Sequence, residues 1–274
     1  MRTLTALLHT KNPRTVREAI TAILYVVSDS DENKLAVVAD HGLEDLAFSC
    51  KYADHRNRKM LSTIFLELAY YSETRSPLLT RSTPAAAIVA LLIRSSSTND
   101  DFIDENLQTT MLALQTLELL AIDTPSLITG QENLLEYLLA LPSRINDKKV
   151  QLLAAQLLVN WTHSLENCER LCYTPGLTDN LLYFAHSNDP NLIKVIATLS
   201  LRLTEPIGLR SKLNDDDFQE FLGYLQNASN DRQTWNLAAQ ALDNLQNKPD
   251  SGFIQKKPVR SVSITSSDSE PMRQ

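Results

Sequence analysis

The chain has 274 residues, of which 43% are hydrophobic, 22% are charged and 6% are aromatic, and it contains 6 glycines. Few glycines and few aromatic residues argue against a β-sandwich or a β-barrel, whereas the abundance of leucine and alanine favours helices. The formal net charge of −7 at pH 7 argues against non-specific binding to nucleic acid, which usually needs a positive surface.

The cysteines indicate a reducing compartment. Cys50, Cys168 and Cys172 are an odd number without the spacing of a disulfide framework. Only His163 lies near Cys168 and Cys172 as a further metal ligand, so no metal site and no cofactor are expected. No apolar run approaches the roughly 20 residues of a membrane span, and the first residues do not form a secretory signal. We therefore expect a cytoplasmic protein, with shuttling to the nucleus left open.

The chain contains an internal repeat. Asp147, Asp189 and Asp231 stand 42 residues apart in three stretches that align without gaps. Steps toward the N-terminus give three further equivalents, Glu105, Asp54 and Asn12. We call these six the corner residues. Side-chain oxygens of Asp and Asn accept hydrogen bonds from free backbone N–H groups at a helix start, so each corner residue is predicted to begin a long helix. Extra residues between two of the corners are assigned to a polar loop at residues 94–101.

The same amphipathic pattern follows each corner residue. Offsets 3, 4, 7, 8, 10, 11, 12 and 14 fall on one side of a helix and are nearly all apolar. Offsets 2, 5, 9, 13 and 16 fall on the opposite side and are mostly polar. Because the phase is kept six times, the pattern predicts a stacked array of helices with one shared polar face.

Taken in chain order, the repeats form a domain that spans residues 1–247. The first unit holds two helices, at 3–9 and 13–28, and each later unit has two shorter helical segments before the long one. Six units are predicted, at residues 3–28, 31–72, 74–122, 124–164, 165–204 and 206–247. Residues 248–274 are rich in Ser, Pro and charge and are predicted to be a disordered tail.

Three helices per unit of about 42 residues resemble the armadillo repeat. Residues 167–205 are similar to the β-catenin-like form of that repeat. The ends of two long helices match the family's third helix: Ala155-x-x-Leu158-x-Asn160 and Ala239-x-x-Leu242-x-Asn244. The resemblance covers about residues 3–247. It implies an all-α, armadillo-type right-handed α-solenoid of about six three-helix repeats, whose third helices line a concave groove for extended peptides.

The polar offsets of the long helices give the candidate groove residues. In the family that the chain resembles, Asn at offset 13 bonds the backbone of a bound peptide. Four amides are candidates for this role here: Gln156, Asn160, Gln240 and Asn244. Seven bases lie at the polar offsets: Arg14, Arg17, Arg56, Lys59, Lys149, Lys194 and Arg202. Only three acids accompany them, Glu67, Glu118 and Glu205. A positive groove attracts negative charge, so we expect an acidic or phosphorylated segment. The alternative is an ordinary hydrated helix face.

We therefore expect a non-catalytic scaffold or adaptor that binds an extended segment of a partner protein. No catalytic motif is visible, and the five histidines are spread over different repeats. Importin-α-like proteins place Trp at offset 9, where none occurs here, so a receptor for basic import signals is disfavoured. Two alternatives stay open: an assembly subunit that packs through its terminal repeats or convex face, and a regulatory domain that binds a small metabolite between repeats.

Two further features bear on partners. Trp161 is expected in the core, whereas Trp235 is expected to be partly exposed at the last repeat, so a homodimer through the terminal repeats is left open. In the tail, Ser261, Ser263 and Ser267 are candidates for regulatory phosphorylation. A phosphorylated tail that docks in the groove of its own chain is a further hypothesis.

Overall fold

The computed structural model describes residues 2–39, 41–96, 103–122, 134–228 and 231–246. Helices make up most of these residues, and the described ranges contain no β-strand. The expectation of an all-α fold is confirmed. The predicted tail, 248–274, lies outside the described residues, and so do its candidate phosphorylation sites.

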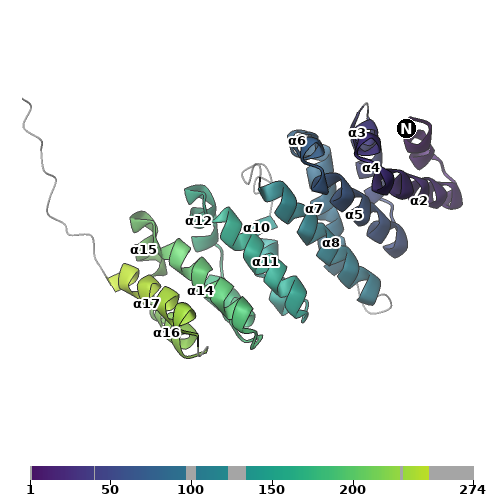
Figure 1. Cartoon of the computed structure of the whole chain (residues 1–274). Coiled ribbons are helices and arrows are strands. Elements are labelled where there is room, and N and C mark those ends of the chain that lie inside the picture. The colour runs from purple at the N-terminus through teal and green to yellow at the C-terminus, as the bar shows by residue number, and fades with distance from the viewer. Residues whose placement is uncertain (1, 40, 97–102, 123–133, 229–230, 247–274) are drawn as a thin grey trace, which may run out of the picture.

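One layer of the structure consists of the long helices. They are α2 (Pro13–Asp29), α5 (His55–Tyr70), α8 (Ile103–Ala121), α11 (Lys148–Trp161), α14 (Pro190–Thr204) and α17 (Arg232–Gln246). Each contacts the next along the chain, and together they form a row across the molecule (Figure 1). We call their common outer surface the third-helix face.

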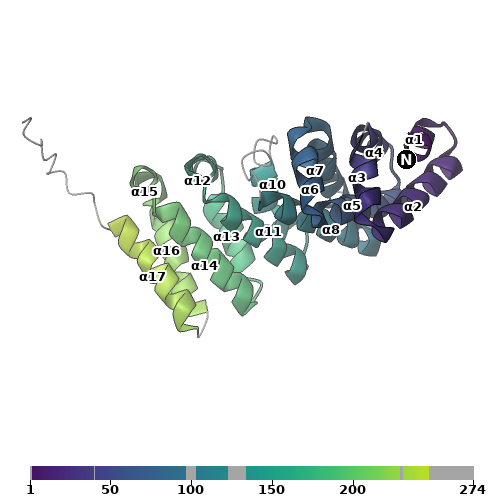
Figure 2. The ribbon, with the colours of Figure 1, turned by 45° about the horizontal axis from the view of Figure 1, so that its top comes forward.

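Shorter helices pack behind this row. The helices that directly precede the long ones are α1 (Arg2–Ala6) with η1 (Leu7–His9), α4 (Gly42–Cys50), α7 (Ser82–Ser96), α10 (Leu134–Leu139) with η2 (Leu141–Ser143), α13 (Leu177–Ala185) and α16 (Asp216–Ala228). The first helices of the described units are α3 (Asp31–Val38), α6 (Ser72–Thr80), α12 (Leu165–Cys172) and α15 (Ile207–Leu213). Equivalent helices contact one another in successive units, such as α4 with α7 and α12 with α15 (Figure 2). The predicted stack is thus confirmed.

Five corner residues begin long helices as predicted. Their side chains accept hydrogen bonds from backbone N–H groups two or three residues on, over 2.8 to 3.2 Å. These five are Asn12, Asp54, Asp147, Asp189 and Asp231. Such caps satisfy donors that have no partner within the helix, and replacing one by Ala typically costs about 0.5–2 kcal/mol.

The sixth corner residue was assigned wrongly. Helix α8 begins at Ile103, so Glu105 lies inside its first turn. The burial pattern of α8 matches that of the other long helices when offsets are counted from residue 102, which itself lies outside the described residues. Counting back 42 residues from Asp147 missed the start of α8 because the extra residues lie partly before and partly after that start. Glu118 therefore stands at offset 16 rather than 13, and Asp104 joins the acids at the polar offsets.

The start of the loop predicted at residues 94–101 was also placed wrongly. Helix α7 continues to Ser96, so Arg94 is helical. The Arg94 Nη1 atom donates to the carbonyl oxygens of Cys50, over 3.0 Å, and Lys51, over 2.8 Å, at the end of α4. This arginine therefore ties two successive units together. Residues 97–101 lie outside the described residues.

The C-terminal ends of three long helices are completed by the following unit. In each case a side chain six residues beyond the accepting residue donates to one of the helix's last carbonyl oxygens. The pairs are Arg75 Nε to Ala69, at 2.6 Å, Asn167 Nδ2 to Trp161, at 2.9 Å, and Arg210 Nε to Thr204, at 2.9 Å. Carbonyls at a helix end lack partners within the helix, so these bonds fix the corner between units.

A single apolar core runs between the layers. Trp161 is fully buried in it and Trp235 is 50% exposed, so both expectations for the tryptophans are confirmed. Among the described helices, none is by itself long and apolar enough to cross a membrane. The segments Ser72–Thr80 and Thr83–Ser95 meet that test only as a pair bent by 90°.

Two corner carboxylates make stability depend on pH. Partial burial alone would raise the pKa of Asp54, but hydrogen bonds from the Asn57 N–H and from Arg17 outweigh it and lower that pKa. At Asp231, hydrogen bonds from the Gln233 N–H and the Thr234 hydroxyl lower the pKa. A lowered folded-state pKa contributes stability that is complete above the unfolded value and disappears as pH falls through the folded value.

We therefore expect the urea midpoint to decrease as pH falls below the ordinary aspartate value of 3.8. The double variant Asp54→Asn with Asp231→Asn keeps side-chain oxygens that can cap a helix but removes the titrating groups. Its midpoint should lose less between about pH 5 and about pH 3 than that of the unaltered chain. Equal losses in the two proteins would show that other carboxylates control acid unfolding.

Candidate functional site

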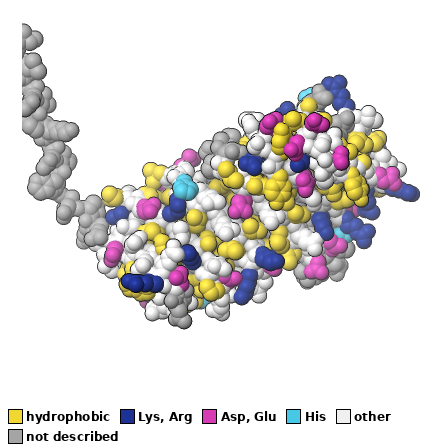
Figure 3. Space-filling view, viewed as in Figure 1, with side chains coloured by type: hydrophobic (Ala, Val, Ile, Leu, Met, Phe, Trp, Pro, Cys, Tyr) yellow, Lys and Arg dark blue, Asp and Glu magenta, His cyan; other side chains and the backbone are white. Residues whose placement is uncertain are grey.

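The third-helix face carries all the predicted groove residues. None of the eleven is buried: each side chain is exposed or half-buried on α2, α5, α11, α14 or α17. Figure 3 shows this face with basic side chains spaced along it and several close together toward the α2–α5 end. The face is therefore available to a partner, and two hollows divide it into regions of different chemistry.

The first hollow lies between α2 and α5 and has a volume of about 450 Å³. Three predicted groove bases line it: Arg17, Arg56 and Lys59. The other lining residues are Thr21, Leu24, Met60, Thr63 and Glu105. The hollow thus combines three cationic side chains with one carboxylate, above a floor to which Leu24 and Met60 contribute apolar surface. We call it the basic hollow.

Ion pairs at this end distinguish the four N-terminal bases. Arg14 pairs with Glu18 on its own helix, with Nε and Oε1 3.0 Å apart. The Arg17 Nη2 atom lies 2.9 Å from Oδ2 of Asp54 in the next unit. For Arg56 and Lys59, the described part of the chain provides no carboxylate within ion-pair distance. These two are the bases best placed to attract an anionic ligand.

Bases at offset 5 also have a structural role. Arg17 pairs with the corner acid of the next unit, and Lys194 is close enough to lower the pKa of Asp231. Lys59, at the same offset, lines the basic hollow together with Glu105 of the next long helix. Part of the positive charge that the sequence places on this face therefore neutralises acids at the following corner.

The second hollow lies between α11 and α14 and has a volume of about 240 Å³. The predicted amides Gln156 and Asn160 line it together with Glu118 of α8. The remaining lining residues are Val159, Val195 and Thr198. Burial raises the pKa of Glu118, so this carboxyl takes up a proton at a higher pH than an ordinary glutamate. We call this the amide hollow; its amides provide both donors and acceptors to an extended backbone.

The other predicted groove residues lie outside both hollows. Arg202 donates through Nη1 to Nδ1 of His163, over 2.8 Å. The Asn244 Nδ2 atom donates to the Thr204 hydroxyl, over 3.3 Å, so part of its hydrogen-bonding capacity is already used. The remaining ones are Arg14, Lys149, Lys194 and Gln240.

The apolar floors of the two hollows were not predicted from the sequence. Leu24 and Val159 stand at offset 12 of one long helix, and Met60 and Val195 stand at offset 6 of the next. The same pair of offsets therefore forms the apolar floor in both places. Apolar residues recurring at offset 6 beside the polar columns are the signal that could have located the hollows. Glu105 was missed because it was taken for a corner residue.

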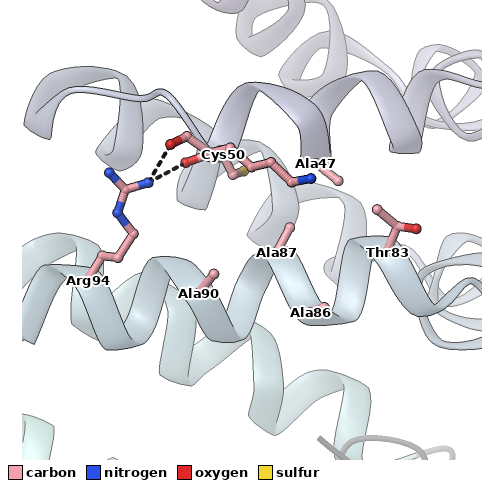
Figure 4. Close-up of a pocket in the computed structure, with 8 residues that line it drawn as sticks. Ala47, Cys50, Thr83, Ala86, Ala87, Ala90 and Arg94 are labelled. Atoms are coloured by element: carbon pink, nitrogen blue, oxygen red, sulfur yellow. Dashed lines mark hydrogen bonds between the residues drawn. The ribbon is translucent and has the colours of Figure 1, made fainter.

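A larger hollow of about 620 Å³ lies on the opposite layer, between α4 and α7. Small side chains of both helices line it, including Ala47, Ala86, Ala87 and Ala90 (Figure 4). Arg94 closes one end, with its guanidinium already bonded to backbone oxygens of α4. This hollow is mainly apolar and provides few polar groups for a metabolite.

Burial favours the protonated form of all three cysteine thiols. Burial raises the pKa of the Cys50 thiol to about 12 and that of Cys172 to about 12, and it also raises the pKa of Cys168. A thiol that stays protonated is a poor nucleophile and a poor metal ligand. Within the described ranges, no group of three or more His, Cys, Asp or Glu is arranged to hold a metal ion.

No protein-family model and no curated protein matches the sequence. Solved structures do match. A computationally designed armadillo repeat protein for modular peptide recognition is 14% identical with a TM-score of 0.67, and the match covers 88% of this chain and 98% of that one. The chain has an armadillo-like repeat fold.

Two further designed armadillo repeat proteins agree. One is 16% identical with a TM-score of 0.62, over 89% of this chain and 98% of that chain. The other, in complex with the peptide (KR)4, is 14% identical with a TM-score of 0.65, over 89% and 98%. At these identities the likeness shows the fold alone. The armadillo-type α-solenoid implied by the resemblance of the repeats is thereby confirmed.

Proposed function

We propose that this armadillo-like protein is a non-catalytic scaffold that binds an extended, acidic or phosphorylated segment of a partner protein along its third-helix face. The observation that carries the proposal is the convergence of Arg17, Arg56 and Lys59 on one open hollow. Three cations around a concavity raise the local positive potential even though the whole chain is acidic.

The amide hollow supports an extended ligand. Gln156 and Asn160 stand on one face of α11, at offsets that repeat on α17 as Gln240 and Asn244. Amides spaced along a row of helices can bond the backbone of a chain that crosses several units, independent of its side chains. Charge at the basic hollow would then select which segment binds.

One designed armadillo repeat protein is in complex with (KR)4, a peptide of alternating basic residues. Bases are frequent on the third-helix face of the present chain, and like charges would repel such a peptide. We therefore propose that this chain has the opposite charge preference.

The test compares three labelled peptides by fluorescence anisotropy. Two consist of alternating Asp and Glu, one of them with a central phosphoserine, and the third consists of alternating Lys and Arg. The acidic peptides should bind and the basic one should not. The variant Arg56→Glu with Lys59→Glu should weaken acidic-peptide binding at least about tenfold, because each reversal turns attraction into repulsion. Arg14 and Arg17 are left unchanged because they pair with Glu18 and Asp54.

A matched control makes the same change of charge on the opposite layer. Lys51 directly follows α4 and Lys212 lies on α15, and both are exposed. Because these positions lie away from the third-helix face and their charges are screened there, Lys51→Glu with Lys212→Glu should leave peptide affinity within about twofold. Circular dichroism should show equal helicity in all three proteins. The proposal fails if the two double variants lose equal affinity, or if the basic peptide binds as well as the acidic ones.

One observation favours an assembly subunit as the second candidate. The alanine-lined hollow between α4 and α7 is larger than either hollow on the third-helix face and mainly apolar. A partner that inserts an apolar side chain there would be insensitive to the charge reversals above. Loss of partner binding in Ala90→Glu, with acidic-peptide binding unchanged, would identify this second surface.

A further inference from the structure

Each long helix has a stripe of residues that faces the next unit. It consists of offsets 4, 8, 11 and 15 from the corner residue. In α14 these four are buried: Ile193, Ala197, Ser200 and Thr204. The same offsets are buried in α5 and α11, where they are Arg58, Ser62, Phe65, Ala69, Gln151, Ala155, Leu158 and Thr162. The stripe is therefore the surface on which one unit stacks upon another.

In α17 this stripe is uncovered. Trp235 is 50% exposed, Ala239 and Leu242 are half-buried and Gln246 is exposed. The stripe on the other side of α17, at offsets 3, 7, 10 and 14, is buried like its equivalents: Thr234, Ala238, Ala241 and Leu245. The difference arises because the described chain provides no following long helix. Helix α17 lies at the end of the row (Figure 1). The side chains of Trp235 and Leu242, which a following unit would cover elsewhere in the stack, are therefore left uncovered.

The sequence after α17 suits this surface. Pro249 stops a helix, and the run Pro249-Asp250-Ser251-Gly252 has the residue types of a tight turn. A turn at these residues would send the chain back along α17. The first two large apolar residues after Gln246 follow at once, Phe253 and Ile254.

The lengths agree. An extended chain advances about 3.3 Å per residue, and a helix rises about 1.5 Å per residue, so three residues of returning chain pass about six residues of helix. Phe253 and Ile254 would then lie beside Leu242 and Ala239. Lys256, a little further on, would reach the ring of Trp235, where a cation over an indole face is favourable.

We propose that residues 253–256 of the chain itself fold back over the uncovered stripe of α17 and cap the end of the repeat array. The segment is joined to the helix that it covers. Its effective concentration is therefore far above that of a second copy in dilute solution. Burial of Phe253 and Ile254 against Leu242 and Ala239, with Lys256 over the ring of Trp235, replaces the contact that a further unit provides elsewhere in the stack.

The test uses acrylamide quenching of tryptophan fluorescence in the full chain. Trp161 is fully buried, so Trp235 dominates the quenchable signal, and a Trp235→Phe chain supplies the baseline. Trp235 should be protected in the unaltered chain. Phe253→Ser with Ile254→Ser should raise the quenching constant of Trp235 about twofold or more, because residues 253–256 would no longer stay on the stripe and cover the ring. The control Val259→Ser with Val262→Ser removes apolar residues further along and should leave protection intact.

Concentration separates the two occupants of the stripe. Protection by the chain's own segment should not change over a hundredfold dilution. Protection that disappears on dilution would mean that a second copy covers α17, and this would overturn the proposal. Equal quenching of Trp235 in the unaltered and Phe253→Ser/Ile254→Ser chains would overturn it as well.

Discussion

Replacing Trp161 by alanine is expected to lower the free energy of unfolding by about 3–5 kcal/mol, the range typical of a large buried aromatic residue. The indole is fully buried in the core, near the middle of the array. Its removal leaves a cavity between α11 and its neighbours and takes away apolar contact that no other side chain can supply. Urea unfolding followed by circular dichroism would measure the loss.

The second tryptophan gives a matched control. Trp235→Ala removes the same side chain from a position that is 50% exposed, so the loss should be well under half as large. Trp161→Phe should also cost much less than Trp161→Ala, because it keeps a ring and removes an indole N–H that has no hydrogen-bond partner among the described residues. Comparable losses in Trp161→Ala and Trp235→Ala would show that burial is not what makes Trp161 important.

The starts of the long helices could be predicted from sequence because their determinants are local. An Asp or Asn accepts hydrogen bonds from N–H groups two or three residues away, so the residue that caps the helix can be recognised in the sequence directly before the helix starts. The ends could not be predicted in the same way. Arg75, Asn167 and Arg210 belong to the next unit and complete the preceding helix from outside.

Errors in the sequence analysis occurred where the repeat length changes. A step of 42 holds from Asp147 to Asp231, and over this part of the chain every corner residue caps a helix. It fails at Glu105, because an insertion gives no sign of how its residues divide between the neighbouring units. The pattern of buried residues along α8 shows how the insertion divides, because only one choice of first residue places the apolar side of the helix in the core.

The groove residues could be placed on one face by helical periodicity, but their pairing could not. The ion pair of Arg17 with Asp54 joins two units, and its geometry depends on how they stack. The count of seven bases therefore overstated the charge available to a ligand. Arg56 and Lys59 can be distinguished from the other N-terminal bases only in the folded structure, where Arg14 and Arg17 have carboxylates beside them.

Gly42 gives the second large effect on stability. A Cβ atom built there would lie far inside van der Waals contact with the carbonyl oxygen of Val37. Because that atom belongs to the backbone of α3, it cannot move aside as a flexible side chain would. Gly42→Ala should therefore separate α3 from α4 and destabilise the second unit by about 1–3 kcal/mol or more, as overpacking does elsewhere. Urea unfolding would measure it.

A glycine in the middle of α16 supplies a control with the opposite sign. Nothing lies within 4 Å of a Cβ atom built at Gly223, so Gly223→Ala should stabilise by about 0.5–1 kcal/mol through helix propensity alone. Gly176 lies between the first and second helices of a later unit, as Gly42 does in the second unit. Its φ of 70° is left-handed, so this position favours glycine because of its backbone conformation. The two positions thus need glycine for different reasons: Gly42 because there is no space for a Cβ atom, and Gly176 because its backbone is left-handed. If Gly42→Ala stabilised the chain as much as Gly223→Ala, the prediction would be wrong. The backbone between α3 and α4 could then shift to accept a Cβ atom without loss of stability.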